Sequence, residues 1–211
     1  MKKKNHILTI VSLLIALGTM SVFAAAPVAT AGRMPEAAVL TERGYTSVTL
    51  DANLIPTLGS LGVTLSPLAP STRFNASEGK ASFPIVTGIF NPNSTTAEIG
   101  HSGGLVLSGG GIVLVLSSFN VNLPSTGSPV LTGLATLNGA LVGRLPLFDL
   151  GLAGVGISYQ GSKVTIDGVD LTLNSDAAAT LNAIFGTSAF AGGLPIGTGA
   201  VRSNLDELPL E

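Results

Sequence analysis

Short apolar segments, separated by turn residues, follow one another along the chain from about residue 45. Residues 119–123 alternate strictly, because Phe, Val and Leu are separated by two asparagines. Two apolar runs flank residues 108–111, Ser-Gly-Gly-Gly, which is a typical β-hairpin signal. A repeat of two indicates strands that bury one face, so the pattern predicts a mostly β domain.

Further turns are expected at Asn138-Gly139, at 160–162 (Gln-Gly-Ser) and at Asp167-Gly168. Turn signals that recur roughly every 8–12 residues are typical of all-β domains built from antiparallel strands. We therefore expect an antiparallel β-sandwich or a barrel-like domain. Prolines between residues 56 and 70 divide that region into short pieces, which favours edge strands or connections there.

One short α-helix is expected near the C-terminus. Asn174 or Ser175 provides its N-cap, and Asp176 lies in the first turn, where the helix dipole favours a carboxylate. An apolar stripe follows, and Gly186 ends the helix. The stripe consists of Ala177, Leu181, Ile184 and Phe185.

The N-terminus, residues 1–24, has the parts of a secretory signal peptide. Three lysines follow the first methionine, and the apolar run 7–17 is too short to remain in a bilayer. Residues 22–24, Val-Phe-Ala, offer small residues at the positions that a signal peptidase reads. We expect an exported protein that is periplasmic, on the cell surface or extracellular. No later segment is long and apolar enough to form a transmembrane helix, so the mature chain is not expected to span a membrane.

The remaining chain divides into three parts. Residues 25–44 have no clear period and are expected to form a linker. Residues 45–202 are expected to form a single β-rich domain, which is long enough to bury a core without disulfides. The acidic segment 203–211 is expected to be a flexible tail.

The composition narrows the range of functions. Charged residues make up only 10% of the chain, against about 25% in ordinary globular proteins, and the formal net charge is −2. Since no basic patch is present to neutralise phosphates, nucleic acid is not expected as a partner. The absence of cysteine excludes disulfides, thiolate metal sites and cysteine nucleophiles.

Residues 100–104, Gly-His-Ser-Gly-Gly, match the G-x-S-x-G pattern around the nucleophile of serine hydrolases. A serine nucleophile needs a base within hydrogen-bond distance, normally a histidine. His6 lies in the signal peptide, and His101 adjoins Ser102, so in an extended chain their side chains point to opposite faces. A pair of Ser102 with a lysine stays open, although nothing in the sequence positions a lysine there. We expect no catalytic residue and no enzymatic activity.

Two other patterns carry less information. Residues 123–127, Leu-Pro-Ser-Thr-Gly, match the sortase signal, but that signal works near a C-terminus, so we expect a loop between strands. The glycines at 109–111 lack the lysine and the helix of a phosphate-binding loop. The aspartates are not spaced like a calcium loop, and no metal site is expected.

His101 remains as the candidate functional residue. A lone histidine after a glycine, at the start of a strand, can ligate a metal or haem iron, or hydrogen-bond a loop. Exported haem carriers often use tyrosine as axial ligand with histidine as its partner, and only Tyr45 and Tyr159 are available. Tyr45 begins a segment, 45–50, whose apolar side carries Val48 and Leu50 and whose other side carries Tyr45.

Two segments resemble HtaA-type domains. Residues 99–123 resemble the part of that family in which a turn rich in glycine, with one histidine, enters a strand. Residues 171–201 resemble the closing element, an Ala- and Phe-containing segment followed by a return flanked by glycines. The resemblance covers most of residues 45–202 and implies a secreted, β-rich, non-enzymatic domain of the haem-uptake type. His101 would match the family's histidine, and Tyr45 lies in the part of the chain where the family carries its aromatic–Arg–x–Tyr stretch, which this sequence lacks.

Two functions of different classes follow. The first is binding of a hydrophobic ligand, with haem as the candidate that the resemblance implies, through His101 and Tyr45. The alternative is a structural or adhesive surface module without a small-molecule ligand, whose partner is an envelope protein or polymer. Low charge and strands rich in Gly, Thr and Ser favour the alternative.

Overall fold

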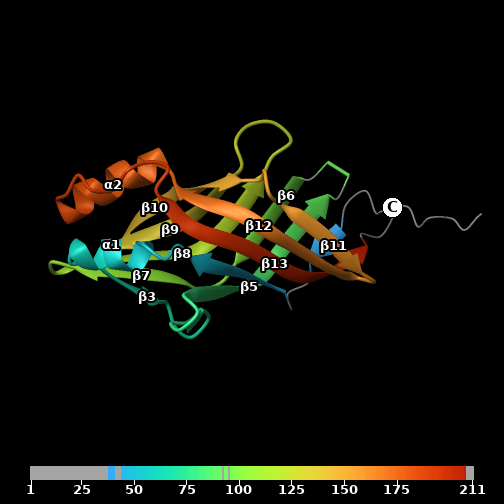
Figure 1. Ribbon diagram of the computed structural model, residues 1–211, viewed down its shortest axis with the longest axis horizontal. Helices are drawn as coiled ribbons and strands as arrows, with labels where there is room; N and C mark the ends of the chain where they lie inside the picture. Colours follow the sequence, from blue (N-terminus) through green and yellow to red (C-terminus); the bar gives the residue numbers. More distant parts are fainter. Residues whose placement is uncertain (1–37, 41–43, 92, 95, 208–211) are drawn as a thin grey trace, which may run out of the picture. The chain divides into compact units, whose positions relative to one another are not determined.

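A computed structural model describes residues 38–40, 44–91, 93–94 and 96–207 (Figure 1). The expected signal peptide at 1–24 lies outside the described residues, as does most of the expected linker at 25–44. The described residues all fall within one unit of the chain, residues 34–211.

Antiparallel strands make up most of the described chain, as the repeat of two predicted. The strands are β1 (Ala38–Leu40), β2 (Tyr45–Leu50), β3 (Thr64–Pro67), β4 (Arg73–Asn75), β5 (Lys80–Asn91), β6 (Thr96–His101), β7 (Gly104–Gly109), β8 (Ile112–Leu123), β9 (Val130–Leu137), β10 (Ala140–Gly151), β11 (Gly156–Gln160), β12 (Lys163–Leu173) and β13 (Pro195–Glu207). The helices in the described part are α1 (Leu54–Ser60) and α2 (Ser175–Phe185).

Eight of these strands close into an antiparallel barrel. Around the ring the order is β13, β2, β5, β6, β8, β9, β10 and β12, and β12 pairs again with β13. β1 pairs with the same two strands as β2, further along each of them, and β11 extends the sheet beside β12. Of the two architectures that the sequence left open, the barrel is therefore correct. A ring of eight strands encloses an interior that is filled by side chains or holds one small ligand.

The ordered strands extend past both expected ends of the domain. β1 lies in the segment expected to be a linker, and β13 continues to Glu207, inside the segment expected to be a flexible tail. Strand pairing explains this extension, because Leu205 lies opposite Leu40. The backbone N–H of Leu205 also donates to the carbonyl oxygen of Ser162 (2.7 Å).

The C-terminal helix confirms the sequence prediction. The side chain of Asn174 accepts a hydrogen bond from the backbone N–H of Asp176 (3.0 Å), and Gly186 ends α2 in the left-handed conformation. No helix in the described part of the chain is long and apolar enough to cross a membrane.

The second helix, α1, was not predicted, because Pro56 indicated an edge strand or a connection. Proline is tolerated in the first turn of a helix, where the backbone N–H groups have no acceptor within the helix. Pro56 is the third residue of α1. Leu54 and Leu58, one turn apart, are buried and hold the helix against the sheet.

Three of the expected turns are confirmed. β7 and β8 meet at Gly110-Gly111, β9 and β10 at Asn138-Gly139, and β11 and β12 at Gly161-Ser162. The Leu-Pro-Ser-Thr-Gly segment at 123–127 begins on the last residue of β8 and continues in the connection to β9, as expected.

The turn expected at Asp167-Gly168 is wrong, because both residues lie inside β12. The register against β13 shifts between Asp167 and Val169, so Gly168, with φ 82°, belongs to a β-bulge. The bulge changes which side chains point inward, and Ile166, Val169 and Leu171 all line the interior as a result. The sequence could not separate the two cases, because a bulge and a hairpin turn both place a glycine in the left-handed conformation.

The two ends of the barrel are built differently (Figure 1). We call the end toward β11 the barrel half, because strands surround it. At the other end β10 separates from β12, since the two strands pair only over 148–151 of β10. α2 follows β12 directly and packs against β10, and α1, β3 and β7 lie around the same interior space. We call this end the helical half.

Candidate functional site

The Gly-His-Ser-Gly-Gly stretch at 100–104 is a corner in the barrel wall. β6 pairs with β5 up to His101, and the chain then turns into β7, which pairs with β3. Ser102 follows the corner residue, and its backbone N–H donates to the carbonyl oxygen of Pro84 (3.0 Å). The chain continues into a strand, whereas a nucleophile elbow leads into a helix.

The two glycines after Ser102 are needed for this corner. Gly103 has φ 86°, and at Gly104 a side chain would collide with the carbonyl oxygen of Leu116 on β8. The buried hydroxyl of Thr72 holds the corner from the other side, because it accepts from Gly104 N–H (2.7 Å) and donates to Gly104 C=O (2.9 Å). Geometry of the wall therefore accounts for the motif without any catalytic role.

His101 points from the corner into the barrel, and only 4% of it is exposed. Its Nε2 lies 2.6 Å from Oγ1 of Thr46, and its Nδ1 lies 3.4 Å from the carbonyl oxygen of Phe119. A carbonyl oxygen can only accept, so Nδ1 carries the proton and Nε2 accepts a hydrogen bond from the Thr46 hydroxyl. The rings of Phe83 and Phe119 meet edge to face beside this pair, with centroids 5.2 Å apart. We call these four residues the waist.

The imidazole is neutral in this setting. Burial lowers the pKa of His101 to about 4, and hydrogen bonds to the backbone of Phe119 and Ile99 raise it only in part. Since both ring nitrogens are engaged by Thr46 and Phe119, neither of them serves Ser102 as a base. The histidine is thus a neutral polar group inside an apolar interior.

Tyr45 lies on the other side of the barrel wall. It precedes Thr46 on β2, so its side chain points outward, where it is 44% exposed. There it borders a surface hollow together with Arg73 and Lys80. The structure therefore does not bring Tyr45 and His101 together.

Haem binding of the kind that the resemblance implies needs a tyrosine as the axial ligand of the iron and a histidine as the partner of that tyrosine. The hydroxyl beside His101 belongs to Thr46, which lacks the acidity of a phenol. Tyr45 and His101, as placed, do not form such a pair. A ligand-binding role for either residue alone stays a prediction.

An apolar cavity of about 240 Å³ lies in the barrel half, beyond the waist, and we call it the barrel cavity. No charged residue lines it, and the hydroxyl of Thr46 is the one polar side-chain group among the described residues around it. Its wall includes Phe90, Ile99, Val121, Leu150 and Ile157. Such a lining favours an apolar occupant over ordered water.

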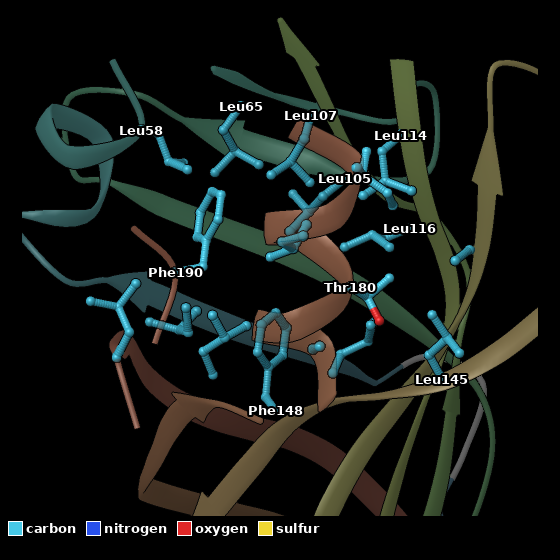
Figure 2. Close-up of a pocket in the computed structure, with 18 of the residues that line it drawn as sticks. Leu58, Leu65, Leu105, Leu107, Leu114, Leu116, Leu145, Phe148, Thr180 and Phe190 are labelled. Carbon is cyan, nitrogen blue, oxygen red and sulfur yellow. The ribbon is translucent and has the colours of Figure 1, made fainter. Parts of the chain in front are cut away.

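A second apolar cavity, of about 80 Å³, lies in the helical half, and we call it the helical cavity (Figure 2). Leucines from β7 and β8 face it from one side, and α2 passes along it. Thr180 supplies the one polar side chain among the described residues that line it. The labelled leucines of the wall are Leu58, Leu65, Leu105, Leu107, Leu114, Leu116 and Leu145.

The waist separates the two cavities. A gap of about 40 Å³ beside His101 shares Leu50 and Phe148 with the helical cavity. The same gap shares Val48 and Leu131 with the barrel cavity. The interior is thus a series of apolar spaces with one hydrogen-bonded pair at its narrowest part.

Thr46 is the residue of this site that the sequence did not single out. It shares the face of β2 with Val48 and Leu50, so the alternation did contain the signal that it points inward. Its pairing with His101 joins residues far apart in the chain, and no local pattern carries that information.

No family model and no curated protein matches this sequence. Among solved structures, the C-terminal domain of HtaA from Corynebacterium glutamicum is similar to it, with a TM-score of 0.59 and 12% sequence identity. The match covers 80% of this chain and 99% of that domain. The chain has the fold of this domain. A domain-swapped dimer of a histidine-to-alanine variant of the same domain gives a TM-score of 0.51 and 13% identity, over 70% of this chain and 87% of the other.

At these identities the comparison concerns the fold alone. It confirms, at that level, the resemblance to HtaA-type domains that was drawn from residues 99–123 and 171–201.

Proposed function

We propose that this protein is an exported, non-enzymatic domain that binds a hydrophobic ligand inside its barrel half. The observation that carries the proposal is the barrel cavity, with its volume of about 240 Å³ and its apolar lining. An apolar cavity of about 150 Å³ in another protein stays dry and binds benzene. The barrel cavity has room for a larger ligand.

The energetic cost of the cavity supports an occupant. In core mutants of another protein, the free energy of unfolding falls by about 24 cal/mol for each Å³ of cavity left behind, so unfilled apolar space of this size is unfavourable for the folded state. A ligand that fills the cavity would offset this cost.

The lining also limits the chemistry of the ligand. Since no charged side chain faces the cavity and His101 is neutral, the enclosed part of the ligand must be uncharged. Haem would need a free lone pair for its iron, and the Nε2 lone pair of His101 already accepts from Thr46. We therefore propose a neutral, lipid-like or aromatic hydrocarbon ligand, and haem is the alternative that the test must separate.

The test is a fluorescence titration of the purified protein with N-phenyl-1-naphthylamine, a neutral probe that emits in apolar sites. Ala97→Leu places extra carbons in the barrel cavity, and we expect it to weaken probe binding about tenfold or more. Ala177→Leu, which fills the helical cavity instead, is the matched control and should leave binding of this probe unchanged. Binding that Ala97→Leu does not affect would contradict the proposal.

A parallel titration with hemin separates the alternative. We expect no Soret band beyond that of an inert control protein. A Soret band that disappears in His101→Ala would replace our proposal with haem binding at the waist. A protein that binds neither probe would exclude the ligand-binding function altogether.

A further inference from the structure

The helical cavity is lined almost entirely by aliphatic side chains. Figure 2 shows leucines from β7, β8 and β10 pointing toward one another beside α2, with the Thr180 oxygen at one side. No charged residue belongs to the lining among the described residues. A group inside this cavity can gain only apolar contacts, so it must be a hydrocarbon.

The size of the helical cavity selects among hydrocarbons. Its volume of about 80 Å³ is a third of that of the barrel cavity and below the roughly 150 Å³ that holds a benzene ring in another protein. A planar macrocycle or a fused ring system does not fit this space. A single unbranched chain, a few methylene groups deep, does.

The cavity reaches the surface between α2 and β10. Leu181 and Ile184 of α2 line it although each is only half-buried, and Val142 of β10 lines it while 50% exposed. Leu141, next to Val142, is 71% exposed and is the most exposed of the large apolar side chains in the described chain. Apolar surface therefore continues from the inside of the cavity to Val142 at its mouth.

The same end of the protein is almost free of charge. The described residues that line the cavity fall in the segments 50–65, 105–116, 135–148 and 173–196. The charged residues of these segments are Asp51, Arg144 and Asp176, of which Arg144 is the one cation. Arg144 is held on the outer face of the sheet, where it donates to the carbonyl oxygen of Ser118 (2.9 Å). Among the described residues, no cation at the mouth is thus free to bind a carboxylate or phosphate, and a ligand must be held by its chain.

We propose that the helical cavity is a second binding site, separate from the barrel cavity, which takes the end of one linear acyl chain of a lipid. The chain enters between α2 and β10, past Val142 and Ile184, and lies against the leucines of β7 and β8. Its polar end remains outside the cavity. Each methylene group that leaves water adds to the affinity, so binding depends on how far the chain enters the cavity.

The experiment uses the purified protein and cis-parinaric acid methyl ester, a linear, uncharged probe that fluoresces in apolar surroundings. Ala177→Leu, which fills the helical cavity, should weaken its binding about tenfold or more. Ala97→Leu, which fills the barrel cavity, should leave binding of this probe unchanged. The affinity should be the same at low and high salt, because no charge takes part.

A second pair of variants protects the test against misfolding. Ile184→Trp blocks the mouth from a half-buried position, so the fold has little reason to change, and it should also weaken binding. Val142→Ser should reduce binding by less, whereas Ile89→Ser, at a similarly exposed position of β5 that does not line the cavity (53% against 50%), should have no effect.

The outcomes separate this site from the proposed function. If Ala97→Leu abolishes binding of the linear probe while Ala177→Leu and Ile184→Trp do not, the proposal of a second site is wrong and the proposed barrel site is retained. Loss in Ala177→Leu and Ile184→Trp, with N-phenyl-1-naphthylamine binding intact, would support two sites. No binding of the linear probe by the unmodified protein would also overturn the second site, whatever the aromatic probe does.

Discussion

The two halves of the barrel enclose the same kind of apolar interior in different ways. In the barrel half, neighbouring strands pair around the ring, so backbone hydrogen bonds form the wall. In the helical half, residues 140–147 of β10 form ladder pairs with β9 alone in the described structure, and α2 covers the open side. The backbone joins the two elements at the start of the helix, where the N–H of Asn174 donates to the carbonyl oxygen of Leu147 (3.0 Å). A wall of paired strands opens only when several hydrogen bonds break together, whereas a packed helix can move by itself.

This difference in construction affects how easily each part of the interior can open. The waist residues His101 and Thr46 are buried and hydrogen-bonded, which fixes the side chains between the two cavities. Leu181 and Ile184 of α2 are half-buried, so their contacts are weaker and the mouth of the helical cavity is the easier place to open. We therefore expect the helical half to open more readily than the barrel half.

The largest expected effect on stability compares a side chain of the waist with a side chain of the helical half. Phe119→Ala removes a ring that is 4% exposed and packed on Phe83, and it should lower the free energy of unfolding by about 3–5 kcal/mol. Leu181→Ala removes a half-buried side chain of α2 and should cost only about 1 kcal/mol. Urea unfolding of the two variants and the unmodified protein measures both values. Equal losses would mean that the helical half is packed as tightly as the waist.

The next effect concerns the protonation of His101. Its pKa is about 4 in the folded protein and 6.5 in the unfolded chain, so between these values the unfolded state binds more protons. The contribution of neutral His101 to the free energy of unfolding should therefore be complete above pH 6.5. It should fall by about 3 kcal/mol as the pH is lowered to 4. His101→Gln cannot titrate, and it should show a correspondingly smaller loss over the same range.

The free energy of unfolding of the unmodified protein and of His101→Gln, measured at several pH values between 4 and 7, checks this prediction. The difference between the two values at each pH cancels the effect of carboxylates that titrate in both proteins. Identical pH dependence in both would show that His101 is not the buried neutral group described above. Where His101→Gln is too unstable to compare, an NMR titration of the imidazole in the unmodified protein gives its pKa directly.

The elements that the sequence predicted are those with a local cause. α2 has its N-cap Asn174, its dipole-favoured Asp176 and its terminating Gly186, and all three act as expected. The Asn138-Gly139 turn needs only the left-handed conformation of two adjacent residues, which the structure shows. The repeat of two along the strands predicted an all-β domain but could not choose between a sandwich and a barrel, since ring closure depends on the pairing of β12 with β13.

The elements that were missed depend on partners distant in sequence. Gly168 lies in a bulge because β13 passes beside it, and α1 forms because Leu54 and Leu58 have a sheet to pack on. The candidate site divides in the same way. The inward direction of His101 follows from the alternation of β6, in which Ala97, Ile99 and His101 are the buried positions, but its partner Thr46 is brought there by the fold.

The smallest expected effect tests whether α2 opens independently. The side chain of Asn174 accepts from Asp176 N–H (3.0 Å) and its Nδ2 donates to Oδ1 of Asp149 on β10 (2.7 Å), so it joins the start of the helix to the strand that borders the mouth. Asn174→Ala should lower the stability of α2 by about 1 kcal/mol, which is about a fivefold faster hydrogen exchange of its amides. Asn174→Ser keeps a cap but loses the bond to Asp149, and should show an intermediate rate.

Hydrogen exchange followed by mass spectrometry resolves this difference, because peptides from α2 and from β12 and β13 can be compared in one experiment. If the two halves are as distinct as their construction indicates, only the α2 peptides accelerate in Asn174→Ala, while the amides of the paired strands keep their rates. Equal acceleration in α2 and in the strands would mean that the helix opens only with the whole barrel. The mouth between α2 and β10 could then not act as the entry to the helical cavity.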